Sequence, residues 1–247
     1  MAYRERRVLC VAVAAGLALG GCGGAVVTAP GTTSTLRDTH DASGPVTAVR
    51  LDTSAGGVIV RGSADATKTT IRRVVRYHGE APGRTYGTSG GTLTLRGCGR
   101  ECSVDYTVTA PAGLPVTGRG QAGGIDLTRV GRVNVTTEAG AVRVDGAAGP
   151  VAARTEAGAI SGTRLASGPV SARTENGGID LAVAKPADVR ATTENGGVRV
   201  TVPSAAYRVS AQVNGVGERT IGVREDSSAA HALDLATGNG DIDVRAG

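Results

Sequence analysis

The sequence predicts an all-β protein, a single-domain β-solenoid in which each repeat of about 18–19 residues holds two short strands. The first observation is a hexapeptide, Thr-Glu-Ala-Gly-Ala-Val, that begins at Thr137 and returns in related form at Thr155, Thr174 and Thr193. The steps between these threonines are 18, 19 and 19 residues. Apolar and polar residues also alternate within each copy, and the whole chain lacks Phe and Trp.

Aligning the copies places like residues in columns. One column holds Val133, Val151, Val170 and Val189, and the column two residues later holds Val135, Ala153, Ala172 and Ala191. The threonines follow after two more residues, and a glycine-containing turn leads to Val142, Ile160, Ile179 and Val198. Residues between the columns are mostly polar. A period of two with one apolar side is typical of a strand that buries one face.

Columns that stay in register predict coils that lie on one another, with strands stacked about 4.8 Å apart. Val, Ala and Thr would form a thin core, which agrees with the lack of Phe and Trp because a narrow coil cannot enclose large rings. The alternative is an antiparallel β-sandwich or meander. The Asn176-Gly177 and Asn195-Gly196 pairs support that alternative, since Asn-Gly is typical of a tight hairpin turn.

The first 21 residues have the pattern of a targeting segment. Three arginines precede an apolar run from Val8 to Leu19, which is too short for a membrane-spanning helix. Leu19-Gly20-Gly21-Cys22 then resembles the lipobox of bacterial lipoproteins. The resemblance implies a lipoprotein signal peptide at 1–21, cleavage before Cys22 and lipid on the Cys22 sulfur. An ordinary secretory signal with a chance cysteine is the alternative.

Residues 22–44 are rich in Ala, Thr, Ser, Gly and Pro and have no apolar period, which predicts a flexible tether. We expect the repeat domain to cover residues 45–247. Within it, Ile71–Tyr77, Leu93–Leu95 and Ser103–Ala110 are further expected strands outside the regular array. The less regular ends of the domain are expected to cap the terminal coils.

The span from Val46 to Val244 resembles the DUF4097, or Toastrack, family of bacterial envelope proteins. The matching features are recurring Gly-x-[Val/Ile]-x-Val segments, the Tyr106–Pro111 strand that ends in Pro-Ala-Gly, and the closing Asn-Gly-Asp-Ile at 239–242. The resemblance implies a right-handed β-helix-like fold, an adhesin-like role and a place at the cell envelope. It supplies no catalytic residues.

The charge argues against nucleic acid as a partner. The formal net charge is +5, of which the targeting segment carries +2, so the remainder is a mild +3. The arginines are spread through the strands among Asp and Glu, whereas a nucleic-acid binder is expected to gather its basic residues, often beside aromatic rings. Acidic polymers of the envelope remain candidate partners.

Cys98 and Cys102 are the two thiols of the domain, in the segment Gly97-Cys98-Gly99-Arg100-Glu101-Cys102. In an oxidising compartment the natural interpretation is a structural disulfide, and the flanking glycines allow the loop to fold back. A redox-active pair is the alternative, although such pairs usually have two intervening residues. Zinc would need more ligands than this segment offers, so we expect no metal here.

A column of glutamates, one in each copy, is the other feature that could carry chemistry. Stacked carboxylates could hold a cation or raise the pKa of one another, as in a catalytic pair. The alternative is an exposed ladder of mixed charge, because Arg154 and Arg173 precede two of the glutamates by two residues. The column consists of Glu138, Glu156, Glu175 and Glu194.

These observations predict a non-enzymatic protein, anchored by lipid on Cys22 at the extracytoplasmic face of a bacterial cell membrane. We expect a surface scaffold that acts in adhesion or envelope sensing, with an envelope protein or polysaccharide as partner. No cofactor and no catalytic residue is expected. The alternative function is a module that binds a cation, a small ligand or a glycan through the stacked Glu and Asn turns.

Overall fold

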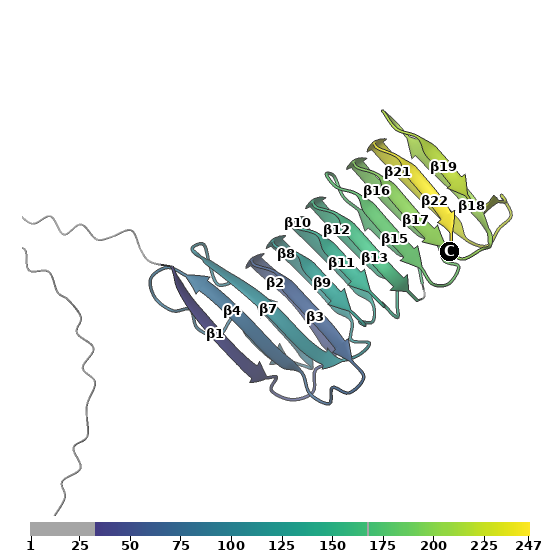
Figure 1. Cartoon of the computed structure of the whole chain (residues 1–247). Coiled ribbons are helices and arrows are strands. Elements are labelled where there is room, and N and C mark those ends of the chain that lie inside the picture. The colour runs from purple at the N-terminus through teal and green to yellow at the C-terminus, as the bar shows by residue number, and fades with distance from the viewer. Residues whose placement is uncertain (1–32, 167) are drawn as a thin grey trace, which may run out of the picture. The chain divides into compact units, whose positions relative to one another are not determined.

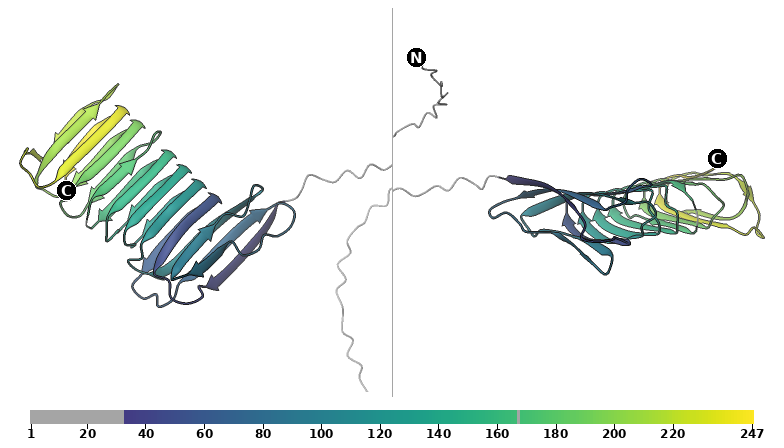
Figure 2. Two further views of the ribbon diagram at one scale, coloured as in Figure 1. Left: turned by 180° about the vertical axis from the view of Figure 1, so that it is seen from behind. Right: turned by 90° about the horizontal axis from the view of Figure 1, so that it is seen from below.

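A computed structural model describes residues 33–166 and 168–247. These residues form two parallel-stranded sheets that lie face to face, as the view from below in Figure 2 shows. Each coil contributes one strand to each sheet, so the expected β-solenoid with two strands per repeat is confirmed. The described residues contain no helix long and apolar enough to cross a membrane. The expected signal peptide, the lipobox and Cys22 lie outside the described residues.

Eleven strands form sheet A, the front layer in Figure 1. In spatial order they are β1 (Ser34–Asp41), β4 (Thr70–Tyr77), β7 (Cys102–Pro111), β3 (Val58–Ser63), β9 (Ile125–Thr128), β11 (Val142–Asp145), β13 (Ile160–Leu165), β15 (Ile179–Val183), β17 (Val198–Val202), β22 (Ile242–Ala246) and β19 (Arg219–Gly222).

Eleven further strands form sheet B. Taken from the same end of the molecule, they are β5 (Tyr86–Ser89), β6 (Thr92–Arg96), β2 (Ala48–Ala55), β8 (Val116–Ala122), β10 (Val133–Ala139), β12 (Val151–Ala157), β14 (Val170–Arg173), β16 (Val189–Asn195), β21 (Ala232–Asn239), β18 (Ala206–Val213) and β20 (Arg224–Glu225).

The valine column predicted from the sequence is present in sheet B. Val133 pairs with Val151, Val151 with Val170, and Val170 with Val189, always between parallel strands. All four side chains are buried, and the column continues to Leu233 of β21. The antiparallel sandwich is therefore wrong for the repeat. Among the described residues, antiparallel pairing of strands occurs only where β1, β4 and β7 meet and between β5 and β6.

The Asn-Gly pairs make corners between the two sheets instead of hairpins. Gly177 has φ of +157° and lies directly over Gly158 of the previous coil. A β-carbon on Gly177 would come within 2.2 Å of the Gly158 carbonyl oxygen. Since the coils repeat at the spacing of sheet strands, each corner leaves no room for a side chain, and glycine is required there. The same close approach holds at Gly123, Gly140, Gly158, Gly196 and Gly240.

Side chains from both sheets fill the space between the layers. The core consists mainly of Val, Leu, Ile and Ala, and the described tyrosines all lie outside the central coils β8–β17. Gly162 interrupts one apolar column, and the side chain of Leu165 lies in the space left by its missing β-carbon. Small residues therefore suit the narrow middle of the solenoid, while large rings are found only near its ends.

The chain does not add its coils strictly in order at either end. At the first end, β2 and β3 lie between β6 and β7 on the outside and β8 and β9 on the inside. At the other end, β18 and β19 occupy an outermost position, and the chain then returns to insert β21 and β22 beside β16 and β17. The last strands in sequence are thus not the end of the solenoid.

The predicted tether does not reach residue 44. Ser34–Asp41 forms strand β1, which pairs antiparallel with all eight residues of β4, and the compact domain begins at Thr33. The prediction from composition was wrong because Thr, Ser and Asp are common both in linkers and on exposed edge strands. Here Thr35, Arg37 and Thr39 lie on the exposed side of the edge strand β1.

Candidate functional site

The outer face of sheet A carries a column of charged and polar side chains that runs along the solenoid. Strand register places one member on each successive strand: Asp126, Arg143, Ser161, Asp180, Arg199 and Asp243. These residues alternate with buried ones such as Val198 and Val200, so they point away from the core. We call these six residues the charged column.

Arg199 is the centre of the column in the later coils. Its guanidinium lies 3.6 Å from the Asp180 carboxylate on one side and 3.7 Å from the Asp243 carboxylate on the other. Asp243 is also bound by Arg245, whose side chain donates a hydrogen bond to it. The hydrogen bond to Asp243 raises the pKa of the Arg245 guanidinium above its ordinary value. Carboxylate and guanidinium groups thus alternate at the spacing of the strands.

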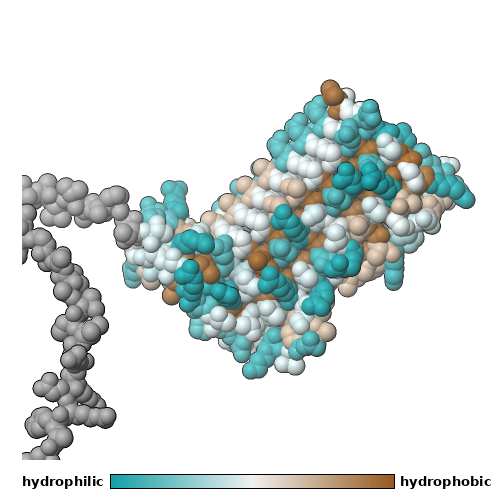
Figure 3. Space-filling view, in the orientation of Figure 1, coloured by the Kyte–Doolittle hydropathy of each residue, from teal (hydrophilic) through white to brown (hydrophobic). Residues whose placement is uncertain are grey.

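A groove of about 400 Å³ lies beside this part of the column. Its lining includes Ala159, Gly178 and Gly197, the small residues that follow the corner glycines. The groove crosses four neighbouring strands, β13, β15, β17 and β22. Smaller hollows of about 250 and 240 Å³ lie beside it towards β19 and over β3, β7 and β9. Figure 3 shows this face with hydrophobic patches between hydrophilic groups. The lining of the groove therefore combines small residues with charged side chains.

The glutamate column lies on the outer face of sheet B. Glu138, Glu156, Glu175 and Glu194 are outward-facing, and Arg154 on β12 lies 3.6 Å from Glu175 in the next coil. This contact fits the mixed-charge interpretation. No group of three or more His, Cys, Asp or Glu side chains within residues 33–166 and 168–247 is arranged to hold a metal ion.

The asparagines of the corners form a ladder of their own. The Asn195 amide donates to the Asn176 side-chain oxygen at 3.2 Å, and the Asn239 amide donates to the Asn195 oxygen at the same distance. The Asn239 oxygen then accepts from the backbone N–H of Val216 in the outermost coil. Because these amides bind one another, they link coils, and the ligand site that we considered for them is not formed by free groups.

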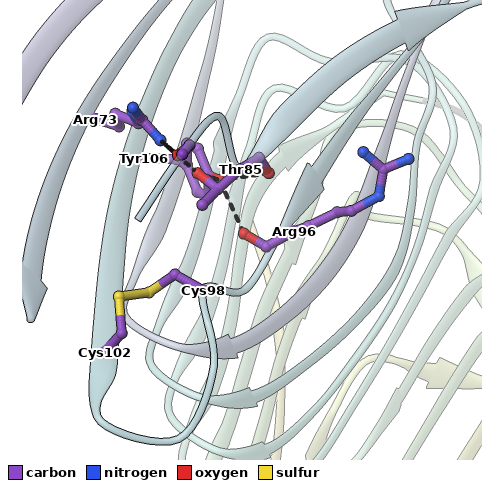
Figure 4. The surroundings of a disulfide bond; sticks show 7 residues. Arg73, Thr85, Arg96, Cys98, Cys102 and Tyr106 are labelled. Carbon is purple, nitrogen blue, oxygen red and sulfur yellow. Dashed lines mark hydrogen bonds between the residues drawn. A yellow bond between two sulfur atoms is a disulfide. The ribbon is translucent and has the colours of Figure 1, made fainter. Parts of the chain in front are cut away.

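Cys98 and Cys102 are joined by a disulfide, with their Cα atoms 5.6 Å apart, in the loop that leads into β7 (Figure 4). The Tyr106 hydroxyl lies nearby on β7, 2.8 Å from the Arg96 carbonyl oxygen and 2.9 Å from that of Thr85. Burial raises the pKa of Tyr106. Disulfide and hydroxyl together fix the loops that close the first end of the solenoid.

Sequence reasoning missed the buried polar cluster at that end. Arg73 is buried, and its Nε lies 2.8 and 2.9 Å from the two carboxylate oxygens of Asp38 on β1. Its Nη1 donates to the Gly83 carbonyl and to the Thr85 hydroxyl. A signal exists in the sequence, since Arg73 takes an inward position between Ile71 and Val75, but its partner Asp38 falls in the segment that composition predicts to be a tether.

No family model and no curated protein matches the chain, so the DUF4097 resemblance is not confirmed by sequence comparison. Two solved structures share part of the geometry. A "putative cell adhesion protein" of Clostridium sporogenes ATCC 15579 is 12% identical, with a TM-score of 0.39 over 87% of this chain and 100% of its own. A "putative adhesin" of Bacteroides fragilis NCTC 9343 is 14% identical, with a TM-score of 0.49 over 85% and 97%. At these values the function of neither protein transfers to this chain.

The carboxylates of the later coils share one cation. Asp180 and Asp243 both face the Arg199 guanidinium and lie on an open face. Charged groups of both signs therefore repeat from strand to strand along the groove.

Proposed function

We propose that this chain is a non-enzymatic, lipid-anchored protein of the bacterial cell envelope, and that its solenoid is an adhesion-like interaction module. The partner we propose is an extended, polar polysaccharide of the envelope, which lies along the charged column of sheet A. The observation that carries the proposal is the groove beside Asp180, Arg199 and Asp243, which extends across four strands.

The ion pairs of the column add little to the stability of the fold. Arg199 and Asp180 are both more than half exposed, and such surface pairs typically contribute about 0–1 kcal/mol. Their value for an interaction is greater, because complementary charges set the orientation and specificity of a partner. The glycine and alanine residues in the lining let a ligand approach the backbone closely, and the flanking carboxylates and guanidinium can bind its hydroxyl groups.

The proposed anchor rests on the lipobox-like Leu19-Gly20-Gly21-Cys22. Residues 23–32 would join Cys22 to the domain, which begins at Thr33 beside β1. The resemblance of the sequence to DUF4097 proteins, which no family model confirms, implies a place at the envelope. The names of the two structural neighbours agree with an adhesive role without adding to the argument.

Replacing Cys22 with Ala tests the anchor. We expect the wild-type protein in the membrane fraction and the Cys22→Ala protein in the soluble extracytoplasmic fraction or the medium. Metabolic labelling with a fatty acid should mark the wild type alone. A wild-type protein that is already soluble and unlabelled would refute the lipid anchor.

Binding to purified, insoluble peptidoglycan with its attached polysaccharide tests the groove. We expect Arg199→Ala to lower the bound fraction about fivefold or more, since it removes the group that engages both carboxylates. The control is Arg190→Ala in the preceding strand β16, because Arg190 is an exposed arginine on sheet B that pairs with Asp234 at 3.6 Å. Equal binding by both variants, with equal melting temperatures, would argue against this face as the binding site.

A further inference from the structure

The net positive charge of the domain comes from its first part. Residues 33–115 contain ten Lys and Arg residues against seven Asp and Glu, whereas residues 116–247 contain fourteen of each. The first part therefore carries the whole formal charge of +3, and the later coils are neutral as a set. It forms the end of the solenoid that the Arg73–Asp38 ion pair caps, opposite the open outermost coil of β18 and β19 (Figure 1).

Three exposed arginines lie close together on the outer face of sheet A at this end. Arg72 and Arg76 flank Val74 on β4, and Arg37 on β1 pairs directly with Val74. Diagonal neighbours of this kind in an antiparallel pair are about 7–8 Å apart. Two threonines of β1 lie opposite Arg72 and Arg76 and add hydroxyl groups. We call this set the basic face: Thr35, Arg37, Thr39, Arg72 and Arg76.

The carboxylates beside the basic face are already bound. Asp105 on β7 pairs with Arg76 at 2.6 Å, and Asp41 at the end of β1 pairs with a lysine at 3.5 Å. Among the described residues, no carboxylate lies within 4.0 Å of the guanidinium of Arg37 or Arg72. Like charges on neighbouring strands repel one another and weaken a sheet. An anion bound over them removes that repulsion, so the face suits a negatively charged partner.

A hollow of about 530 Å³ lies beside Arg76 near the start of β1. Its lining includes a second arginine, Arg100 of the disulfide loop, together with Ser103 and one carboxylate, that of Glu101. Thr33, the first residue of the compact domain, also lines it. The hollow therefore extends the basic face to the point where residues 23–32 join the domain.

We propose that the basic face and this hollow bind the phosphate headgroups of anionic phospholipids. The choice of partner rests on the proposed anchor, because ten residues, 23–32, separate Cys22 from Thr33. A chain of that length spans at most about 36 Å, so an anchored chain holds this end beside the membrane at a high effective concentration. Arginine and hydroxyl groups donate hydrogen bonds to phosphate oxygens, and arginine is the residue that matches them best.

The lipid-binding face and the groove are separate sites. The attraction of a basic residue to an anionic membrane falls off within about 10 Å. Five strand spacings separate β4 from β13, where the groove begins, and this amounts to about 24 Å. Lipid contact through β1 and β4 is therefore confined to the capped end and does not involve the residues of the groove.

Sedimentation with lipid vesicles tests the proposal. The protein used is residues 23–247, which contain the whole compact domain and lack both Cys22 and the apolar run of residues 8–19. We expect it to bind vesicles made of equal parts phosphatidylglycerol and phosphatidylcholine at low salt, and not vesicles of phosphatidylcholine alone. Raising the salt concentration should release it, because screening shortens the range of the attraction.

Two pairs of arginines separate the basic face from the effect of net charge. Arg37→Ala/Arg72→Ala should lower the partition coefficient about tenfold or more, since each basic residue at an anionic surface adds to binding. Arg119→Ala/Arg173→Ala is the matched control, because it removes the same charge from exposed positions on the outer face of sheet B. Arg37→Lys/Arg72→Lys keeps the charge and should retain most of the binding. Melting temperatures check that all these variants fold equally well.

Three results would overturn the proposal. The first is no binding to the anionic vesicles, and the second is an equal loss of binding in the two alanine pairs. The third is a domain that binds soluble polyphosphate but not the vesicles, which would assign the basic face to a soluble polyanion instead.

These outcomes are distinct from those that test the proposed function. The vesicle experiment uses a chain without Cys22, so a wild type that carries no lipid would remove the anchor and leave vesicle binding standing. A lipidated wild type whose domain does not bind vesicles would do the reverse. Arg199→Ala, which tests the groove, should leave the binding of vesicles unchanged.

Discussion

The Thr193 hydroxyl donates a hydrogen bond of 2.8 Å to the carbonyl oxygen of Gly177, one coil earlier. The same bond is formed by Thr155, Thr174 and Thr237, at 2.8–3.0 Å to the corner glycine of the coil before. The repeated threonine therefore has a structural purpose. It occupies an inward position at the corner and ties its coil to the one beneath.

Removing one of these hydroxyls should destabilise the domain. Thr193→Val keeps the shape of the side chain but leaves the partly buried Gly177 carbonyl without this donor, so we expect a loss of about 1–2 kcal/mol in the free energy of unfolding. Urea denaturation measures it. Thr192→Val is the control, because the Thr192 side chain points outward and is partly exposed. Equal losses in both variants would contradict the importance of the buried bond.

The corner glycines should tolerate no side chain. In Gly177→Ala the new β-carbon would lie 2.2 Å from a backbone oxygen at a φ of +157°, so we expect a loss of about 3 kcal/mol or more. In Gly178→Ala, one residue later, the nearest atom would be 3.6 Å away, and the change should be within about 1 kcal/mol. Thermal unfolding of the two variants compares them directly, and a similar melting temperature would refute the steric argument.

The disulfide should stabilise the capped end modestly. The loop between Cys98 and Cys102 is short, and the chain-entropy description gives about 2 kcal/mol for its closure. We expect a reducing agent to lower the melting temperature of the wild type by a few degrees. The Cys98→Ser/Cys102→Ser double variant should have the lower melting temperature from the outset, and the reducing agent should not change it. No response in the wild type would mean that the bond adds nothing.

Stability should also fall at alkaline pH through Tyr106. Burial raises the pKa of Tyr106 in the folded chain above its ordinary value near 10, so the unfolded chain loses this proton first. The stabilisation is complete below pH about 10 and is lost as pH rises through the folded-state pKa. Tyr106→Phe should be less stable than the wild type at pH 7, since the bond to Arg96 is lost. Above pH 10 the stability of Tyr106→Phe should fall less than that of the wild type. Melting curves of both proteins at several pH values measure this difference.

The repeat was accessible to sequence reasoning because each coil repeats the contacts of the last. Val133, Val151, Val170 and Val189 lie in one column since a period of 18 or 19 residues leaves successive coils in register. Strand alternation within one copy then predicts which side chains are buried. The strands at Ile71–Tyr77 and Ser103–Ala110 followed from the same alternation, and β4 and β7 confirm them.

The ends were harder to predict, because no neighbouring copy constrains them. Strand β1 exists through its pairing with β4, which begins almost thirty residues after β1 ends, and the Arg73–Asp38 ion pair forms across that pairing. The insertion of β21 and β22 beneath β18 and β19 is likewise a long-range choice. Local pattern does not encode which of two similar coils lies outermost.

The residues of the candidate site also divide into those that the sequence predicts and those that need the tertiary structure. The residues Asp180 and Arg199 could be read from the sequence as outward-facing members of successive repeats, and the lipid-bearing Cys22 and its anchor stay predictions. The sequence by itself determined the repeat, the direction of its side chains and the need for glycine at its corners, since these depend on contacts between consecutive coils. The tertiary structure alone decided that one end is capped and the other open, because that outcome depends on which distant strands compete for the two terminal edges.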